Sequence, residues 1–160
     1  LADPLSSDTP RPHDGNWGLY LATEQLVWKE TPEEKDSAQG LGIFGRIGYA
    51  PADRNMLDFY VEGGITSTGL IPGRDDDMCG LGIACGKLSG DLRALGRDQN
   101  IFNTTNDPLP DHEIAIDLEY QWKLCKGCLV QPGLQYIIHP GGSSAIDSAL
   151  VLSLRTVVDF

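Results

Sequence analysis

Apolar and polar residues alternate along most of this chain with a period of two. In residues 112–124 the large apolar side chains occupy even positions, and charged, amide or small side chains occupy odd ones. Alternation of this length predicts a β-strand with one apolar face. Such segments follow one another at residues 15–29, 40–50, 56–70, 78–88, 112–124, 128–139 and 148–160. The sequence therefore predicts an all-β chain of about seven antiparallel strands.

The segments between these strands are rich in proline, glycine and polar residues, which predicts turns and loops. Residues 1–14 hold three prolines and no periodicity, so we expect a loop there. Residues 89–111 form the longest break in the alternation, and they predict irregular structure with at most a helical turn at 91–95.

The alternation leaves the two faces of the first strand unresolved, because large apolar residues fall on both parities. They are Trp17, Leu19 and Leu21 on one parity, and Tyr20, Leu26 and Trp28 on the other. In residues 56–70 the pattern is cleaner, and it assigns Leu57 to the apolar face together with Phe59 and Val61.

Long strands with one apolar face fit two architectures. In a soluble β-sandwich the apolar faces of two sheets meet in a core, whereas in a membrane β-barrel they face lipid. The strand lengths match the ~9–11 residues that a tilted strand needs to cross a bilayer. Aromatic residues stand near strand ends on the apolar face, at Tyr49, Tyr120, Trp122, Tyr136 and the terminal Phe160. These features favour a transmembrane antiparallel β-barrel, with a soluble β-sandwich binding module as an alternative.

The composition narrows the class of protein further. With 160 residues and 17.3 kDa, the chain is long enough for one domain, so residues 1–160 are treated as one unit. Its 23 acidic and 12 basic residues give a net charge of −11, which argues against nucleic-acid binding. No apolar run approaches the ~18 residues of a spanning helix. No initiator Met, basic segment or apolar segment opens the chain, so we expect any targeting peptide to have been removed.

The polar positions of the strands predict the lining of a water-filled pore. They are Arg46, Asp58, Tyr60, Glu62, Glu113, Asp117, Glu119, Gln121, Gln131, Gln135, Ser153 and Arg155. Carboxylates and amides accept hydrogen bonds from the hydroxyl groups of a solute, arginine donates to such groups, and an aromatic ring can stack on an apolar ring face. The simpler interpretation is that each side chain only keeps the wall solvated. Arg46 and Arg155 are the strongest individual candidates for a role in the pore, since each cation would polarise a pore whose wall is otherwise acidic.

Motifs that resemble catalytic or cofactor sites have simpler explanations. Asp117 and Glu119 lie about 7 Å apart by strand rise, close to a glycosidase spacing, but alternate acids are typical of any solvated face. Residues 40–45 match the dinucleotide fingerprint, yet they lie inside a strand rather than before a helix. The acidic run at 75–77 lacks the spacing of a calcium loop. We therefore expect no enzyme activity, no cofactor and no metal site.

The four cysteines leave more than one arrangement open. Cys79 and Cys85 lie on one strand about 20 Å apart, so they cannot bond to each other. Cys125 and Cys128 flank a two-residue turn. In an oxidising compartment the alternatives are a bond between Cys125 and Cys128, or a bond from Cys79 to one of them.

Several segments, in order, resemble one known family. They are GLGIFGRIGYAPADRN at 40–55, GGITSTGLIPGRDDD at 63–77 followed by GLGIA, and LVQPGLQYIIHPGG at 129–142 with the terminal LVLSLRTVVDF. These segments are similar to carbohydrate-selective outer-membrane porins of the OprB type, and the resemblance extends from about Trp17 to Phe160. The terminal Phe160 also resembles the signal by which the outer-membrane assembly machinery recognises such barrels.

The resemblance implies a sixteen-stranded barrel that passes monosaccharides such as glucose and other small sugars by passive diffusion. A general-diffusion or structural barrel without sugar selectivity is the alternative. About seven strands cannot close such a barrel, because single-chain bacterial barrels have roughly eight or more. We therefore expect this chain to be the C-terminal part of a porin, and we expect a complementary N-terminal porin polypeptide to complete the wall.

The resemblance also implies a location in the bacterial outer membrane, with the C-terminus at the periplasmic side. Counting back from that end assigns residues 141–147, 89–111 and 50–55 to the outside. The turns at 123–128, 71–77 and 31–39 then face the periplasm. The implied partners are small sugars and outer-membrane lipids, with no nucleic acid, and association into a homo-oligomer stays open.

Overall fold

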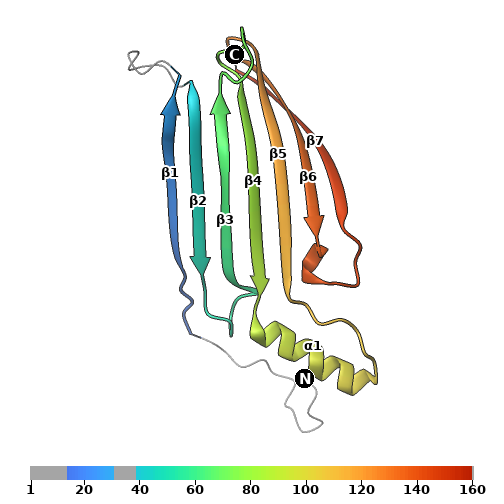
Figure 1. Cartoon of the computed structure of the whole chain (residues 1–160). Coiled ribbons are helices and arrows are strands. Elements are labelled where there is room, and N and C mark those ends of the chain that lie inside the picture. Colours follow the sequence, from blue (N-terminus) through green and yellow to red (C-terminus); the bar gives the residue numbers. More distant parts are fainter. Residues whose placement is uncertain (1–13, 31–38, 160) are drawn as a thin grey trace.

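A computed structural model of the chain describes residues 14–30 and 39–159. The strands in these residues are β1 (Leu19–Lys29), β2 (Gly40–Tyr49), β3 (Leu57–Thr68), β4 (Met78–Leu88), β5 (His112–Cys125), β6 (Cys128–Ile138) and β7 (Ala149–Val158). Each strand pairs antiparallel with its neighbours in sequence, so that one sheet runs in order from β1 to β7 (Figure 1). The all-β antiparallel architecture is confirmed.

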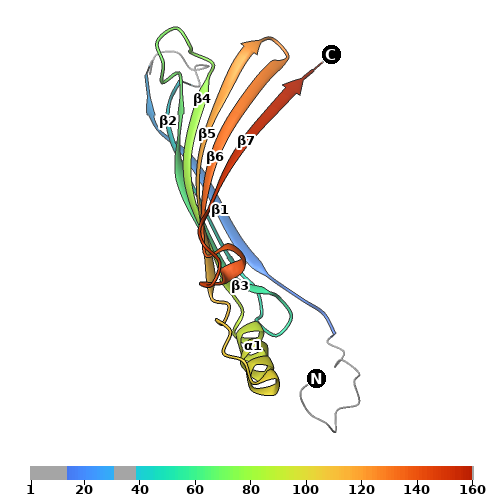
Figure 2. The same ribbon diagram turned by 90° about the vertical axis from the view of Figure 1, so that its right-hand side faces the viewer.

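The sheet is a single curved layer (Figure 2). Among the described residues, no apolar side chain is buried. A β-sandwich would bury the apolar faces of two sheets against each other, so the described residues do not form one. Strands β1 and β7 are the edges of the sheet, and these residues by themselves do not close a barrel.

The apolar face of the sheet is open to its surroundings. On β7, Leu150, Leu152 and Leu154 alternate along one face and are 63%, 78% and 72% exposed. Soluble monomers rarely expose an apolar patch larger than a few hundred Å². An apolar face that extends across all the strands therefore needs a covering other than water.

A shift in the pairing of β1 with β2 explains the mixed parity of the first strand. The register changes between Leu26 and Trp28, which is the signature of a β-bulge. Leu26 pairs with Gly42, whereas Trp28 pairs with Leu41 on the apolar face. The bulge thus brings Trp28 to the same face as Leu19 and Leu21, although their parities differ.

A second shift corrects the assignment of Leu57. Between Leu57 and Phe59 the register of β3 against β4 changes by one residue. Leu57 pairs with Leu88 on the polar face, and its Cδ2 lies 3.2 Å from the position that a Cβ on Gly86 would take. The prediction that Leu57 belongs to the apolar face was wrong, because alternation cannot be followed through a bulge.

Residues 89–111 contain the helix α1 (Gly90–Asn103), so the prediction of irregular structure there was wrong. Ser89 caps the helix by accepting a hydrogen bond from the backbone N–H of Leu92 at 3.2 Å. The helix ends at Thr104, which adopts a left-handed conformation. None of its residues is buried, so it has no apolar stripe that a sequence pattern could reveal. No helix in the described part is long and apolar enough to cross a membrane.

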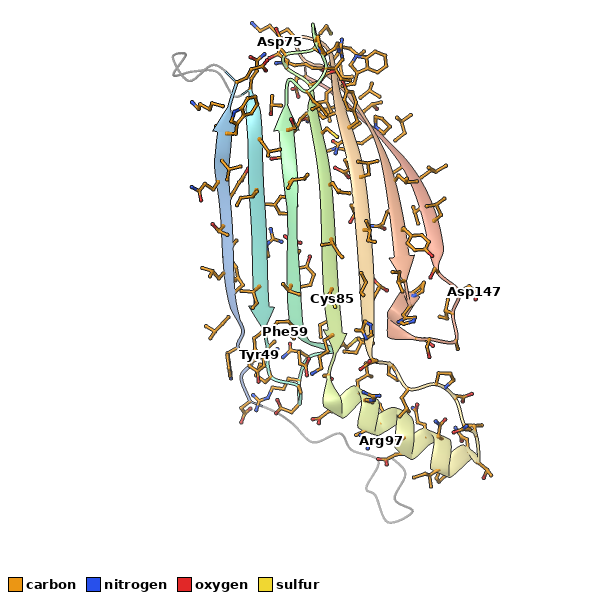
Figure 3. The ribbon with its side chains drawn as sticks, viewed as in Figure 1. Tyr49, Phe59, Asp75, Cys85, Arg97 and Asp147 are labelled. Carbon is orange, nitrogen blue, oxygen red and sulfur yellow. The ribbon has the colours of Figure 1, made fainter. Side chains whose placement is uncertain are left out.

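The connections between strands gather at two ends of the sheet. One end, called the helix end, carries α1 and the loops at 50–56 and 139–148; the other, called the turn end, carries the loop at 69–77 and the turn between β5 and β6 (Figure 1). Figure 3 places Asp75 at the turn end, and Tyr49 and Phe59 near the helix end.

The loop at the turn end is anchored by one buried carboxylate. Asp77 is 3% exposed and accepts hydrogen bonds from Arg74 Nε at 2.7 Å and from the backbone N–H of Lys123 at 3.0 Å. Arg74 Nη2 and the hydroxyl of Tyr120 also donate to Asp77, and the Arg74 guanidinium lies 5.3 Å from the ring centre of Trp122. The hydrogen bond from Arg74 lowers the pKa of Asp77 to about 2, although burial opposes this effect. This carboxylate thus ties the β3–β4 loop to β5.

Candidate pore wall

The strand register brings the predicted pore-lining residues to one face of the sheet, which we call the polar face. On it lie Arg46 of β2, Tyr60 and Glu62 of β3, Glu113, Asp117, Glu119 and Gln121 of β5, Gln131 and Gln135 of β6, and Ser153 and Arg155 of β7. Glycine and alanine occupy the same face of β4 from 80 to 86. On this face, strands with polar side chains therefore lie on either side of β4, which carries only small residues there from 80 to 86.

Arg46, Glu62 and Tyr60 form one connected group on β2 and β3. Arg46 Nη1 lies 3.3 Å from Glu62 Oε1, and the Tyr60 hydroxyl donates a hydrogen bond to Glu62. The side chain of Glu62 is 19% exposed, whereas that of Arg46 is 53% exposed. The carboxylate is thus held against the wall, and the guanidinium remains within reach of a solute.

A second group lies on β5, β6 and β7. Gln135 Nε2 donates to Asp117 Oδ1 at 2.7 Å, and Gln131 donates to Glu119 in the same way. Arg155 stands directly opposite Gln131 in the register. Amide and carboxylate pairs offer both donors and acceptors, which is the combination that a hydroxyl-rich ligand needs.

Members of both groups line a hollow of about 430 Å³ on the polar face. Its lining includes Phe44, Glu62, Asp117, Glu119, Gln131 and Arg155. A volume of this size falls within the ~300–1,000 Å³ that small-molecule sites occupy. Tyr60 and Gln135 line a neighbouring hollow of about 520 Å³ nearer the helix end.

Asp58 and Glu113 contribute to local structure at the helix end. Asp58 stands at the shifted pairing of β3, and its Oδ2 forms an ion pair with Lys87 at 3.4 Å. Its Oδ1 is buried without a hydrogen-bond partner among the described residues. Glu113 accepts a hydrogen bond from the backbone N–H of Gly141 at 2.6 Å. A role for Asp58 in binding sugar stays a prediction.

Phe44 is a large apolar residue of this wall that is not among the predicted lining residues. It lies on the polar face of β2, opposite Glu24 on β1 and Gly64 on β3. Its ring covers the position where a Cβ on Gly64 would stand, 2.5 Å from Cζ, and reaches within 3.3 Å of the corresponding position on Gly82. The available signal was a single large apolar residue at an even position of 40–50, near glycine-rich strands.

The apolar face carries exposed aromatic residues near both ends. Tyr49 and Tyr136 stand toward the helix end and are 51% and 42% exposed, and Trp122 stands toward the turn end and is 45% exposed. Phe160 lies outside the described residues. Two bands of aromatic residues flanking an apolar surface are typical of the girdles of membrane barrels.

The strand register places Cys125 and Cys128 together and keeps Cys79 apart from both. Cys125 and Cys128 stand opposite each other across the β5–β6 turn. Cys79 pairs with Tyr120, five residues before Cys125, which is roughly 17 Å along the strand and beyond the reach of a disulfide. All four cysteines are free thiols in this structure, so a Cys125–Cys128 bond stays a prediction. Within the described ranges, no three His, Cys, Asp or Glu side chains are arranged to hold a metal ion.

Comparison with known proteins identifies the family. The family model described as "Carbohydrate-selective porin, OprB family" matches residues 2–160. The chain belongs to this family of porins. Porin B of Pseudomonas aeruginosa is 30% identical to it over 145 residues, which cover 86% of this chain and 31% of that protein. The putative porin QuiX of Acinetobacter baylyi is 21% identical over 159 residues, covering 92% of this chain and 35% of that protein.

The fold of this OprB-family chain also matches a solved porin. The high-pH structure of Pseudomonas putida OprB superposes with a TM-score of 0.84 at 28% identity, covering 92% of this chain and 36% of that one. The chain therefore spans about a third of the length of the relatives it matches. The resemblance to porins that the sequence indicated is confirmed.

Proposed function

We propose that this chain forms part of the wall of an outer-membrane porin through which small carbohydrates such as monosaccharides diffuse passively. The observation that carries the proposal is a single sheet that has no apolar core among the described residues and has one exposed apolar face and one polar face. Lipid can cover the first face, and water the second. The carboxylates, amides and guanidinium groups of the polar face can bind sugar hydroxyls, and the family description supports sugars as the solute.

The proposal includes a second part of the wall. Strands β1 and β7 each have one edge without a neighbour among the described residues. In lipid every unpaired backbone N–H and C=O costs several kcal/mol, so both edges require partners. A complementary N-terminal porin polypeptide that supplies the remaining strands of a sixteen-stranded barrel would meet this requirement.

The two ends of the sheet then face different compartments. We assign the turn end, with the C-terminus, to the periplasm, and the helix end to the outside. The longest connection, which contains α1, lies at the helix end, whereas the shortest, the β5–β6 turn, lies at the other end. Short periplasmic turns and longer external loops are the usual asymmetry of such barrels.

A general-diffusion porin without sugar selectivity is the second candidate. The observation that favours it is the internal pairing of the wall, where Arg46 binds Glu62 and Gln135 binds Asp117. Groups that already satisfy one another gain less from a passing sugar.

Two measurements test the proposal. The protein is extracted from outer membranes in detergent and run unboiled and boiled on an SDS gel, with an intact mass for each band. A large unboiled band that releases this chain beside a second polypeptide supports the split wall, whereas a folded species of this chain alone in detergent-free buffer contradicts the barrel.

Conductance in planar bilayers with added glucose then separates a carbohydrate-selective pore, whose ion current falls, from a general-diffusion pore, whose current does not respond.

A further inference from the structure

Phe44 lies on the polar face, although it is a large apolar residue. It stands in a row of register partners that runs from Glu24 through Gly64 and Gly82 to Asp117. Because the two glycines carry no side chains, the ring can lie flat along the wall across β3 and toward β4. A Cβ on Gly64 would stand 2.5 Å from Cζ of Phe44 and 2.6 Å from Cε1, so only glycine permits this placement.

The ring remains accessible from the pore side. Phe44 is half-buried, and it borders two hollows: the one of about 430 Å³ toward β5, and another of about 420 Å³ toward β1 that Glu24 and Arg46 also line. The edge of the ring at Cζ and Cε1 lies over Gly64, and Phe44 lines both hollows, so part of the ring is open to the polar side of the wall.

Polar groups surround this ring. Arg46 and Glu62 lie in the next row toward the helix end, and Thr66 lies in the next row toward the turn end. Asp117 stands opposite Gly82, so it lies one strand, about 5 Å, beyond the glycine that the ring reaches. A flat apolar platform rimmed by donors and acceptors matches a pyranose ring, which has C–H groups on its faces and hydroxyls around its edge.

From this arrangement we infer that Phe44 is a sugar-stacking platform, with Arg46, Glu62 and Asp117 as the hydroxyl-binding rim. The inference rests on the proposed passage of carbohydrates and specifies where on the wall a pyranose binds. The ring face carries negative charge density, which attracts the weakly positive C–H groups of the sugar. Phe44 thus acts as a specificity-determining residue, because small solutes without an apolar face cannot stack on it.

The test uses the complete channel, with any second chain that copurifies, in planar bilayers with KCl. The apparent dissociation constant for D-glucose is the sugar concentration that produces half of the maximal reduction in ion current. We expect Phe44→Leu to raise this constant by roughly threefold to tenfold, while Phe44→Trp stays within about twofold of the parent. Leucine fills the space over the glycines without a flat ring, so packing is retained and stacking is lost.

Phe59→Leu is the matched control, because Phe59 lies on the apolar face of the neighbouring strand, and glucose binding should not change. Equal glucose constants for the parent and Phe44→Leu channels overturn the platform and leave the carbohydrate function intact. A parent channel that conducts ions but does not respond to glucose overturns the proposed function, and the platform with it. If Phe44→Leu prevents the channel from assembling, Phe44→Met is measured instead, and the same rise in the dissociation constant for glucose is expected.

Discussion

At the scale of single residues, the shortest ion pair among the described residues, between Arg74 and Asp77, lies in a loop rather than in the wall. Asp77 is buried at the turn end and accepts hydrogen bonds from Arg74, Tyr120 and the backbone of Lys123. Its pKa is lowered from 3.8 to about 2, so the folded state favours the charged form. A group whose folded pKa is lowered contributes stability above its unfolded pKa and loses it as the pH falls through the folded value.

We therefore expect a loss of stability between about pH 4 and about pH 2 that depends on Asp77. Asp77→Asn should lower the free energy of unfolding at pH 7 by about 2 kcal/mol, because it removes charge-assisted hydrogen bonds. The difference in stability between pH 7 and pH 3 should then be smaller than in the parent. The measurement is the temperature at which the folded band disappears on an unboiled SDS gel, after incubation at each pH.

Asp75→Asn is the control, since Asp75 lies exposed in the same loop. It should leave both the transition temperature and its pH dependence close to those of the parent. An Asp77→Asn protein as sensitive to acid as the parent would show that other carboxylates control the acid transition.

Strand parity predicts single residues well where alternation is unbroken, and fails at irregular pairing. Asp117 and Glu119 lie on the polar face as their odd positions indicate. Leu57 does not follow its parity, because the register shift that moves it depends on how β3 meets β4. Phe44 follows its parity, but its role as a candidate platform depends on Gly64 of the neighbouring strand, and no pattern within one strand contains that information.

At the scale of elements, the strands were predictable and the helix was not. The strands alternate because one face of the sheet is apolar along its whole length. Helix α1 has no buried residue, so its sequence lacks the periodicity that burial imposes. Its start is fixed instead by the Ser89 cap and by an ion pair between Arg93 and Asp111 at 3.0 Å.

We expect Ser89→Ala to loosen α1 without affecting the sheet. Ser89 is 1% exposed, and its hydroxyl is the acceptor for the backbone N–H of Leu92. Loss of such a cap costs about 1 kcal/mol, so amide hydrogen exchange in residues 90–103 should accelerate roughly fivefold. Mass spectrometry of the exchanged protein in detergent micelles measures this rate.

Ser144→Ala, in the exposed loop before β7, should leave exchange in α1 unchanged. Unchanged exchange in Ser89→Ala as well would mean that the Arg93–Asp111 ion pair, rather than the cap, holds the first turns of the helix.

At the scale of the whole molecule, this sheet lacks the usual source of stability of a soluble domain. No apolar side chain in the described residues is buried, so in the proposed wall lipid on the apolar face and strand partners at β1 and β7 would supply the stabilisation. The sequence indicates the apolar face through alternation. It does not specify what pairs with the two edges, because backbone hydrogen bonds leave no trace in residue type.

The charge of the polar face should determine which ions the assembled channel prefers. Glu24, Glu62, Asp117 and Glu119 contribute negative charges, against the positive charges of Arg46 and Arg155. A wall with an excess of one sign raises the local concentration of the opposite ion. We therefore expect a channel that prefers K⁺ over Cl⁻, measured as a reversal potential in a KCl gradient, and Asp117→Asn should reduce the permeability ratio by roughly 1.5- to 2-fold.

Asp98→Asn removes the same charge from α1, outside the sheet, and should shift the ratio much less. The comparison separates two ways in which a cation preference can arise. If Asp117→Asn alone reduces the ratio, ions pass along the polar face, which is then the lumen of the pore. If both variants reduce it equally, the preference comes from the charge at the mouth. An anion-selective parent would contradict the assignment of this acidic face to the lumen of the pore.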